Sequence, residues 1–117
     1  MSTTVLIVDD HAGFRALARR MLEAAGYEIV GEAHDGASAL AAAASLRPHV
    51  VLLDIQLPDL DGFAVSERLA ADADPPAVVL ISSRDESAYR RRLADSPARG
   101  FIGKSELSGR TLAALVS

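Results

Sequence analysis

Short apolar runs alternate with segments of helical periodicity along most of the chain. The runs have the length of strands, and they fall at residues 5–8, 28–33, 50–54, 77–82 and 99–102. This alternation is typical of a parallel sheet with helices on both faces. We therefore predict an α/β fold, a doubly wound five-stranded parallel sheet in strand order 2-1-3-4-5, in which the first and third strands are neighbours.

The clearest predicted helix follows Asp10. Gly26 occupies the position where a C-cap is expected for this helix. Apolar residues recur between these two points at spacings of three and four, which is the period of an amphipathic helix. The apolar positions are Phe14, Leu17, Ala18, Met21, Leu22 and Ala25.

Local signals also delimit the other predicted helices. Asp35 is the expected N-cap of a helix over residues 36–46, and Pro48 ends that helix because proline cannot continue the hydrogen-bond ladder. The Asp- and Pro-rich segment at residues 72–76 predicts a turn. Further helices are expected over residues 62–71, 85–94 and 105–116.

Size and composition favour one compact domain over residues 1–117. Half of the residues are hydrophobic, which is enough to build a core without disulfides or metal. The chain has no cysteine, which excludes disulfides, thiolate catalysis and sulfur-ligated zinc.

Charge and hydropathy limit the possible partners of this chain. Its formal net charge of −4 argues against direct nucleic-acid binding, so any DNA contact would need another domain. No segment approaches the roughly 18 apolar residues of a membrane span. The first four residues lack the features of a signal peptide. We expect a soluble, cytoplasmic protein with no membrane contact.

Carboxylates end two of the predicted strands. Asp9 and Asp10 follow the first apolar run, and Asp54 ends the third. Because ligands of doubly wound sheets bind at the carboxyl ends of the strands, these three side chains are expected side by side at the point where the winding reverses. Such a cluster repels itself unless a proton or a divalent cation neutralises it, and an all-oxygen site suits Mg²⁺.

Two more polar residues reach the same edge. Ser82 ends the fourth predicted strand, and Lys104 follows the fifth. A metal ion, an ammonium group and a hydroxyl group are suited to neutralising the three equatorial oxygens of a phosphoryl group in transfer. In this interpretation Asp54 is the nucleophile that forms an acyl phosphate, while Lys104 and Ser82 contact the phosphoryl oxygens.

The chain resembles a response-regulator receiver domain of the CheY-like kind, which has a flavodoxin-like fold and is the phosphoacceptor of two-component signalling. The likeness covers nearly the whole chain. The segments Asp9 to Arg15 and Arg99 to Ser105 are most similar to receivers of NarL/LuxR-type response regulators that control transcription. The stretches that carry the resemblance are VLIVDD at residues 5–10, DIQLPDLDG at 54–62, VLISS at 79–83 and GFIGK at 100–104.

The resemblance implies roles for the acidic residues. It implies that Asp54 accepts a phosphoryl group from a sensor histidine kinase. Asp10, Asp54 and the backbone carbonyl of Gln56 would bind Mg²⁺ directly, and Asp9 would act mainly through water. The domain would assist its own phosphorylation and dephosphorylation only, and would otherwise not be an enzyme.

The resemblance also implies a switch. Ser82 occupies the switch hydroxyl position, and Phe101 the switch aromatic position three residues before Lys104. Ser82 would move towards the phosphoryl group and Phe101 would turn inward, so that the face formed by the fourth helix, fifth strand and fifth helix changes shape. That face would control a DNA-binding output domain outside this chain, a homodimer or another partner.

Several positions depart from the common family pattern, and two of them bear on the backbone. Ser105 follows Lys104 where many receivers have proline, which argues against the cis peptide usual there. Pro97 stands where glycine often ends the fourth helix, and its fixed φ is incompatible with a left-handed C-cap.

Each candidate residue also has a structural interpretation. A single aspartate at a strand end is usually a solvated cap, and Phe101 alone would be a core aromatic. Asp59 and Asp61 are best interpreted as turn and N-cap residues beside Gly62.

The histidines and one arginine run are open to more than one interpretation. The three histidines show no metal-ligand spacing, although His11 lies beside the acidic pair. Residues 90–92 are three consecutive arginines that form either the solvated side of a helix or part of a partner surface. The histidines are His11, His34 and His49.

Three other function classes remain to be compared with the phosphoacceptor. An aspartate-nucleophile phosphatase or transferase usually needs a second carboxylate two residues after the nucleophile, where this chain has Gln56. A flavodoxin-type module needs a phosphate-binding loop after the first strand, where the acidic pair would instead repel phosphate. The third class is a receiver-like scaffold that is never phosphorylated, which the intact acidic pocket disfavours.

Overall fold

A single parallel sheet forms the centre of the protein. The structure, a computed structural model, describes residues 2–116. The strand order β2-β1-β3-β4-β5 confirms the predicted topology. The strands are β1 (Thr4–Val8), β2 (Glu28–Ala33), β3 (Val50–Asp54), β4 (Ala77–Ser82) and β5 (Gly100–Gly103).

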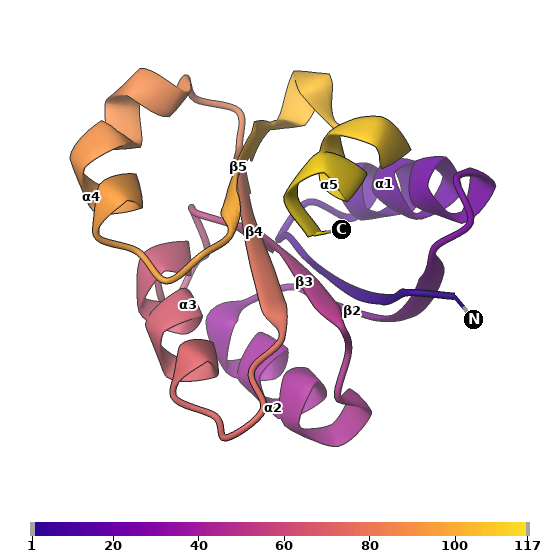
Figure 1. The fold of residues 1–117 in the computed structure, drawn as a ribbon, viewed down its shortest axis with the longest axis horizontal. Helices are drawn as coiled ribbons and strands as arrows, with labels where there is room; N and C mark the ends of the chain where they lie inside the picture. Colours follow the sequence, from indigo (N-terminus) through magenta and orange to yellow (C-terminus); the bar gives the residue numbers. More distant parts are fainter. Residues whose placement is uncertain (1, 117) are drawn as a thin grey trace.

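Helices cover both faces of the sheet. Figure 1 shows α1 and α5 on one side and α2, α3 and α4 on the other. Two short 3₁₀ helices, η1 and η2, precede α4 and α5. The bounds are α1 (Ala12–Ala24), α2 (Gly36–Leu46), α3 (Gly62–Ala70), η1 (Glu86–Tyr89), α4 (Arg90–Ala94), η2 (Lys104–Glu106) and α5 (Gly109–Val116).

Alternate residues of the central strands supply two separate hydrophobic cores. Leu6 and Val8 pack in the core beneath α2 and α3, whereas Val5 and Ile7 pack in the core beneath α1 and α5. Successive side chains of a strand point to opposite faces, so a strand covered on both sides reads as a continuous apolar run. This explains why β1 and β3 were recognisable from sequence.

The predicted ends of the first two helices are confirmed. Gly26 has a φ of 99°, and its N–H donates to the Glu23 carbonyl at 3.0 Å. The Tyr27 N–H donates to the Leu22 carbonyl at 3.0 Å, which completes a Schellman motif after α1. Asp35 caps α2 by accepting from the Ser38 N–H at 2.8 Å.

Two predicted helices are broken in the structure. The helix expected over residues 85–94 is a 3₁₀ turn followed by the five residues of α4. None of the α4 residues is buried, so this segment gains little of the packing that normally stabilises helices. The helix expected over residues 105–116 is interrupted at Leu107, which is extended and buried, and α5 starts only after Ser108.

Smaller differences also correct the predictions. The fifth strand spans Gly100–Gly103 instead of residues 99–102, and α3 ends at Ala70 with Ala71 as its C-cap. Leu17 was predicted on the buried side of α1 but is 46% exposed.

The two departures from the family pattern behave as expected. Within residues 2–116 no peptide bond is cis, so the Lys104–Ser105 bond is trans. Helix α4 ends in an αR C-cap at Asp95, and Arg47 is the one described non-glycine residue with positive φ.

The described helices are all too short to cross a lipid bilayer. The longest, α1, has 13 residues, whereas a span needs about 20.

Candidate functional site

Three carboxylates meet at the carboxyl edge of the sheet, as predicted. β1 and β3 pair in register through Val8 and Leu53, which brings Asp9 and Asp54 next to each other. Both side chains are buried, with exposures of 0% and 3%. Oxygen atoms of Asp9, Asp10 and Asp54 lie within 4.8 Å of one another, together with a ring nitrogen of His11.

Lys104 supplies the positive charge of the site. Its Nζ lies 2.7 Å from Asp9 Oδ2 and donates to Asp54 Oδ2 at 3.2 Å. The ammonium also sits 4.7 Å from the centre of the Phe14 ring, which limits its contact with solvent. Because β3 and β4 lie between β1 and β5 in the sheet, Lys104 reaches the carboxylates from the opposite side of β3.

Burial and charge perturb the two groups that pair across this site. Burial raises the pKa of the Asp54 carboxyl above its ordinary value, although the Gln56 N–H and Lys104 oppose the rise. Burial also disfavours the charged form of Lys104, but Asp9 and Asp54 outweigh it and raise the pKa of the ammonium. Lys104 pairs with Asp9 and Asp54 but not with Asp10, so one ammonium faces a cluster of three carboxylates that is short of positive charge.

The residues present fit a divalent cation. Asp9 Oδ2 is buried, and its contact with Lys104 is an ion pair without hydrogen-bond geometry. The Asp10 side chain is 37% exposed, so a partly hydrated ion can approach it from solvent. Carboxylate oxygens with room for water are the donors that Mg²⁺ prefers.

Gln56 continues the loop after β3. Its N–H donates to Asp54 Oδ1 at 3.1 Å, which orients the carboxylate. Gln56 also forms an isolated antiparallel bridge with Asp61, so the loop folds back on itself at the edge of the site.

Among the described residues 2–116, no hydrogen bond joins either predicted switch residue, Ser82 or Phe101, to the three carboxylates. Ser82 is 1% exposed and lies opposite Gly103 at the carboxyl end of β4. Its hydroxyl bonds to Tyr89 and Arg84. Phe101 is partly buried, with its ring centre 6.2 Å from that of Tyr89.

The family is now identifiable from sequence comparison as well as geometry. The family described as "Response regulator receiver domain" matches residues 5–116 of this chain. The chain belongs to this family. Its fold, the carboxylates at the ends of β1 and β3, and the lysine after β5 are the features on which the sequence resemblance rested.

Individual relatives agree with this family. The transcription regulator BvgA of Bordetella pertussis is 38% identical over 106 residues, which cover 91% of this chain and 51% of BvgA. The DNA-binding transcriptional activator EvgA of Escherichia coli is 30% identical over 110 residues, covering 94% of this chain and 54% of EvgA. The receiver domain thus spans about half the length of these relatives.

A solved structure is similar over almost the whole chain. The signal receiver domain of the response regulator NarL from Mycobacterium tuberculosis is 34% identical and superposes with a TM-score of 0.86. The superposition covers 97% of this chain and 96% of that one. The expected likeness to NarL/LuxR-type receivers is thereby confirmed.

The loop between β3 and α3 is fixed by two aspartates of the receiver domain. Asp61 caps α3 by accepting from the Ala64 N–H at 2.9 Å, as predicted. Asp59 does more than the predicted turn role, because its carboxylate accepts from the N–H groups of Gly36 and Ala37 at 2.7 and 2.9 Å. It therefore ties the loop to the start of α2, a contact that sequence reasoning missed.

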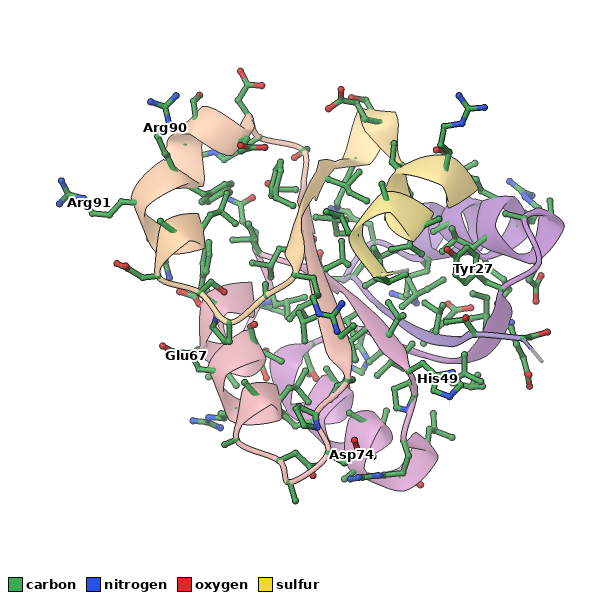
Figure 2. The ribbon with its side chains drawn as sticks, in the orientation of Figure 1. Tyr27, His49, Glu67, Asp74, Arg90 and Arg91 are labelled. Atoms are coloured by element: carbon green, nitrogen blue, oxygen red, sulfur yellow. The ribbon has the colours of Figure 1, made fainter. Side chains whose placement is uncertain are left out.

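The arginines of α4 have different surroundings. Arg90 and Arg91 extend into solvent (Figure 2), as expected for an exposed helix side. Arg92 instead lies 4.2 Å from the centre of the Phe63 ring and bonds Asp61 at 2.7 Å. The arginine run is therefore solvated at two positions and docked on α3 at the third.

The histidines are dispersed over the described residues. His11 Nδ1 lies 3.0 Å from Asp10 Oδ1 and 3.2 Å from Asp9 Oδ1, beside the site. His49 accepts from the Thr4 N–H at 3.0 Å near the amino ends of β1 and β3. His34 is an exposed neighbour of Asp35.

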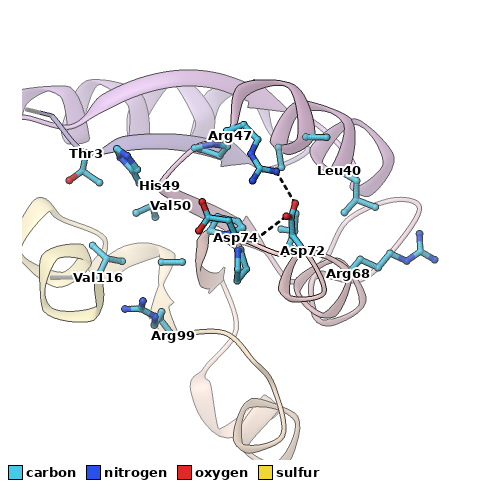
Figure 3. Close-up of a pocket in the computed structure, with 17 residues that line it drawn as sticks. Thr3, Leu40, Arg47, His49, Val50, Arg68, Asp72, Asp74, Arg99 and Val116 are labelled. Carbon is cyan, nitrogen blue, oxygen red and sulfur yellow. Dashed lines mark hydrogen bonds and ion pairs between the residues drawn. The ribbon is translucent and has the colours of Figure 1, made fainter.

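A cavity at the opposite end of the sheet is not the site of the predicted chemistry. Figure 3 shows it beside His49 and Val50, where β3 begins, while Asp54 ends that strand. Arg47 on its wall is paired with Asp72 at 2.9 Å.

Proposed function

We propose that Asp54 of this receiver domain is the residue that accepts a phosphoryl group. The observation that carries the proposal is the pairing of a buried strand-end carboxylate with Lys104 inside a cluster of two further aspartates. A carboxylate in this position is held ready beside an ammonium that can bind a phosphoryl oxygen.

The side chains divide the work of phosphoryl transfer. A carboxylate oxygen of Asp54 forms the new O–P bond while the bond from phosphorus to the donor breaks and the donor leaves with its electron pair. Lys104 turns from Asp54 Oδ2 to an equatorial phosphoryl oxygen, and the Ser82 hydroxyl donates a hydrogen bond to another. The Gln56 N–H keeps the carboxylate oriented, because it already donates to Asp54 Oδ1.

The acidic residues would hold Mg²⁺. Asp10, Asp54 and the Gln56 carbonyl are the proposed direct ligands, and Asp9 acts through water and through its contact with Lys104. When bound, the ion neutralises charge on the phosphoryl oxygens.

The partners follow from the family and from the relatives. We propose that residues 1–117 form one receiver domain in the cytoplasm, that a sensor histidine kinase is its phosphodonor, and that it assists only its own phosphorylation and dephosphorylation. The relatives that are transcription regulators support a DNA-binding output domain outside this chain. A homodimer of the phosphorylated form on the face of α4, β5 and α5 is the proposed means of control, with no direct nucleic-acid contact by this domain.

Intact-mass measurement after incubation with acetyl phosphate and Mg²⁺ tests this proposal. Wild type and Asp95→Asn, whose altered residue is exposed at the end of α4, should each gain one phosphoryl group. Asp54→Asn should gain none, and EDTA should prevent the gain in wild type. A gain on Asp54→Asn would place the acceptor elsewhere, and no gain on wild type would favour the unphosphorylated scaffold.

A further inference from the structure

Ser82 is tied to the segment that follows it in the chain. Its hydroxyl lies 3.2 Å from the Tyr89 hydroxyl and accepts from the Arg84 N–H at 3.0 Å. Both partners belong to the connection between β4 and α4. Any movement of the Ser82 hydroxyl towards Asp54 must therefore disturb this connection.

Tyr89 lies at the centre of an aromatic group. Its side chain is 7% exposed, and its ring centre is 5.9 Å from that of Phe63 and 6.2 Å from that of Phe101. It is the buried residue of η1, and α4 has none. Tyr89 is therefore the main anchor of this segment on the core.

The number of hydrogen bonds that the two hydroxyl groups can donate is limited. Ser82 and Tyr89 have one O–H donor each. In the unphosphorylated protein the two oxygens share a hydrogen bond, and Ser82 already accepts from Arg84. Either oxygen can be the donor of the bond between Ser82 and Tyr89. If Ser82 donates, turning its proton to a phosphoryl oxygen breaks that bond unless Tyr89 becomes the donor. If Tyr89 donates, movement of the Ser82 hydroxyl towards Asp54 lengthens the bond.

We propose that Tyr89 is the positioning residue that holds the Ser82 hydroxyl in the resting state. When that hydroxyl moves towards the phosphoryl group, Tyr89 transmits the movement to η1 and α4. This inference rests on the proposed function, because the phosphoryl group on Asp54 is what draws Ser82 away. Phe101 has no polar atom that could sense the hydroxyl directly. Phe101 responds through the ring of Tyr89, with which it is in contact.

The local backbone suits this role. A 3₁₀ helix has poorer hydrogen-bond geometry than an α-helix and often marks a hinge. Arg92, three residues after Tyr89, joins α4 to α3 through Asp61 and Phe63. A displacement of Tyr89 should therefore shift η1 and α4, whose other described contacts with the rest of the fold come from Arg92 and Leu93.

The composition of the chain gives a direct probe of Tyr89. The protein has no tryptophan and two tyrosines, Tyr27 and Tyr89. Tyr27 packs against the core on the other face of the sheet, near α1 and α5 (Figure 2). Tyrosine fluorescence of Tyr27→Phe thus reports Tyr89 alone, and that of Tyr89→Phe reports Tyr27 alone.

Acetyl phosphate with Mg²⁺ should change the fluorescence of Tyr27→Phe and leave that of Tyr89→Phe nearly unchanged. The change should be absent from Tyr27→Phe that also carries Ser82→Ala. An unchanged Tyr89 signal in protein whose mass shows the phosphoryl group would overturn the inference alone. Absence of the mass gain in wild type would overturn the proposed function and this inference with it.

The phosphorylation rate separates this role from a purely structural one. Tyr89→Phe keeps the ring but removes the hydroxyl group that competes with the phosphoryl group for Ser82. Its rate of mass gain should therefore rise by about three- to tenfold, the factor that corresponds to the net free energy of one neutral hydrogen bond. In the Ser82→Ala background the same substitution should have no effect. Equal rates for wild type and Tyr89→Phe, or an equal change in both backgrounds, would overturn the inference; Tyr27→Phe is the matched control.

Discussion

The two parts of the receiver domain on either side of the turn at residues 72–76 are built differently. The first part contains helices of 13, 11 and 9 residues. The second part contains an α4 of five residues, an α5 of eight and two 3₁₀ turns. Both parts share one sheet, so the difference lies in the segments that surround its carboxyl edge.

The division of elements matches a division of labour at the site. Asp9, Asp10 and Asp54 come from the first part, at the ends of β1 and β3. Ser82, Tyr89 and Lys104 come from the second part. Segments that move in switching are drawn from the less stable elements of a protein, and in the proposed switch the second part supplies them.

Loss of the lysine should have the largest effect on stability. Lys104→Met leaves Asp9 and Asp54 without their cation, so the free energy of unfolding at pH 7 should fall by about 3 kcal/mol in the absence of Mg²⁺. Urea denaturation measures this change, and Mg²⁺ should recover part of it by binding the folded state. Lys104→Arg keeps the charge and should lose less. Equal stability of wild type and Lys104→Met would show that the pair does not hold the second part to the first.

A methyl group at Gly62 should damage the rigid part beside the acceptor. A Cβ there would lie 2.6 Å from the Asp54 carbonyl oxygen and 2.8 Å from the Ile55 Cα, both backbone atoms. Gly62→Ala should therefore lower the free energy of unfolding by about 2 kcal/mol and slow phosphorylation. The control Gly13→Ala meets nothing within 4 Å and should instead be neutral or stabilising. If both substitutions behave alike, close packing does not fix the β3 to α3 loop.

Removal of the α5 cap should weaken the second part selectively. Ser108 Oγ accepts from the Thr111 N–H at 3.0 Å, so Ser108→Ala should cost about 1 kcal/mol of unfolding free energy. Ser45→Ala changes an exposed serine inside α2 and should cost nothing. Hydrogen exchange should show faster opening of α5 and not of α2. Uniformly faster exchange would mean that the two parts open as one unit.

The pH dependence of stability should reveal the buried acceptor, with the smallest effect of the four. Because the folded state raises the pKa of Asp54, this carboxyl favours folding at acid pH and that contribution is lost as pH rises through the raised pKa. Asp54→Asn cannot titrate, so without Mg²⁺ its stability relative to wild type should increase from pH 4 towards pH 7. A relative stability that decreases over this range would contradict a raised pKa.

Much of the site was predictable because it depends on the ends of strands. The apolar runs located β1 and β3, and the rule that ligands bind where winding reverses brought Asp9, Asp10 and Asp54 together. The helix caps were equally predictable from sequence, because Asp35 and Gly26 form hydrogen bonds with backbone groups only a few residues away.

Contacts between distant segments were not predictable in this way. Asp59 bonds the start of α2, 23 residues earlier, and no local pattern encodes that pairing. One helix was expected over residues 85–94, but most of that segment is exposed and gives a helix too little to pack against. The sequence analysis did not single out Tyr89, and no local pattern indicated that its hydroxyl meets Ser82.

Hydrogen exchange followed by mass spectrometry tests most directly whether phosphorylation moves the second part and spares the first. Wild type would be compared with and without acetyl phosphate and Mg²⁺, with Asp54→Asn as control. The predicted result is changed protection in η1, α4 and the β5 to η2 segment of wild type, with α1, α2 and α3 unchanged. Phosphorylated protein whose protection changes equally in α1, α2 and α3, or nowhere, would contradict it.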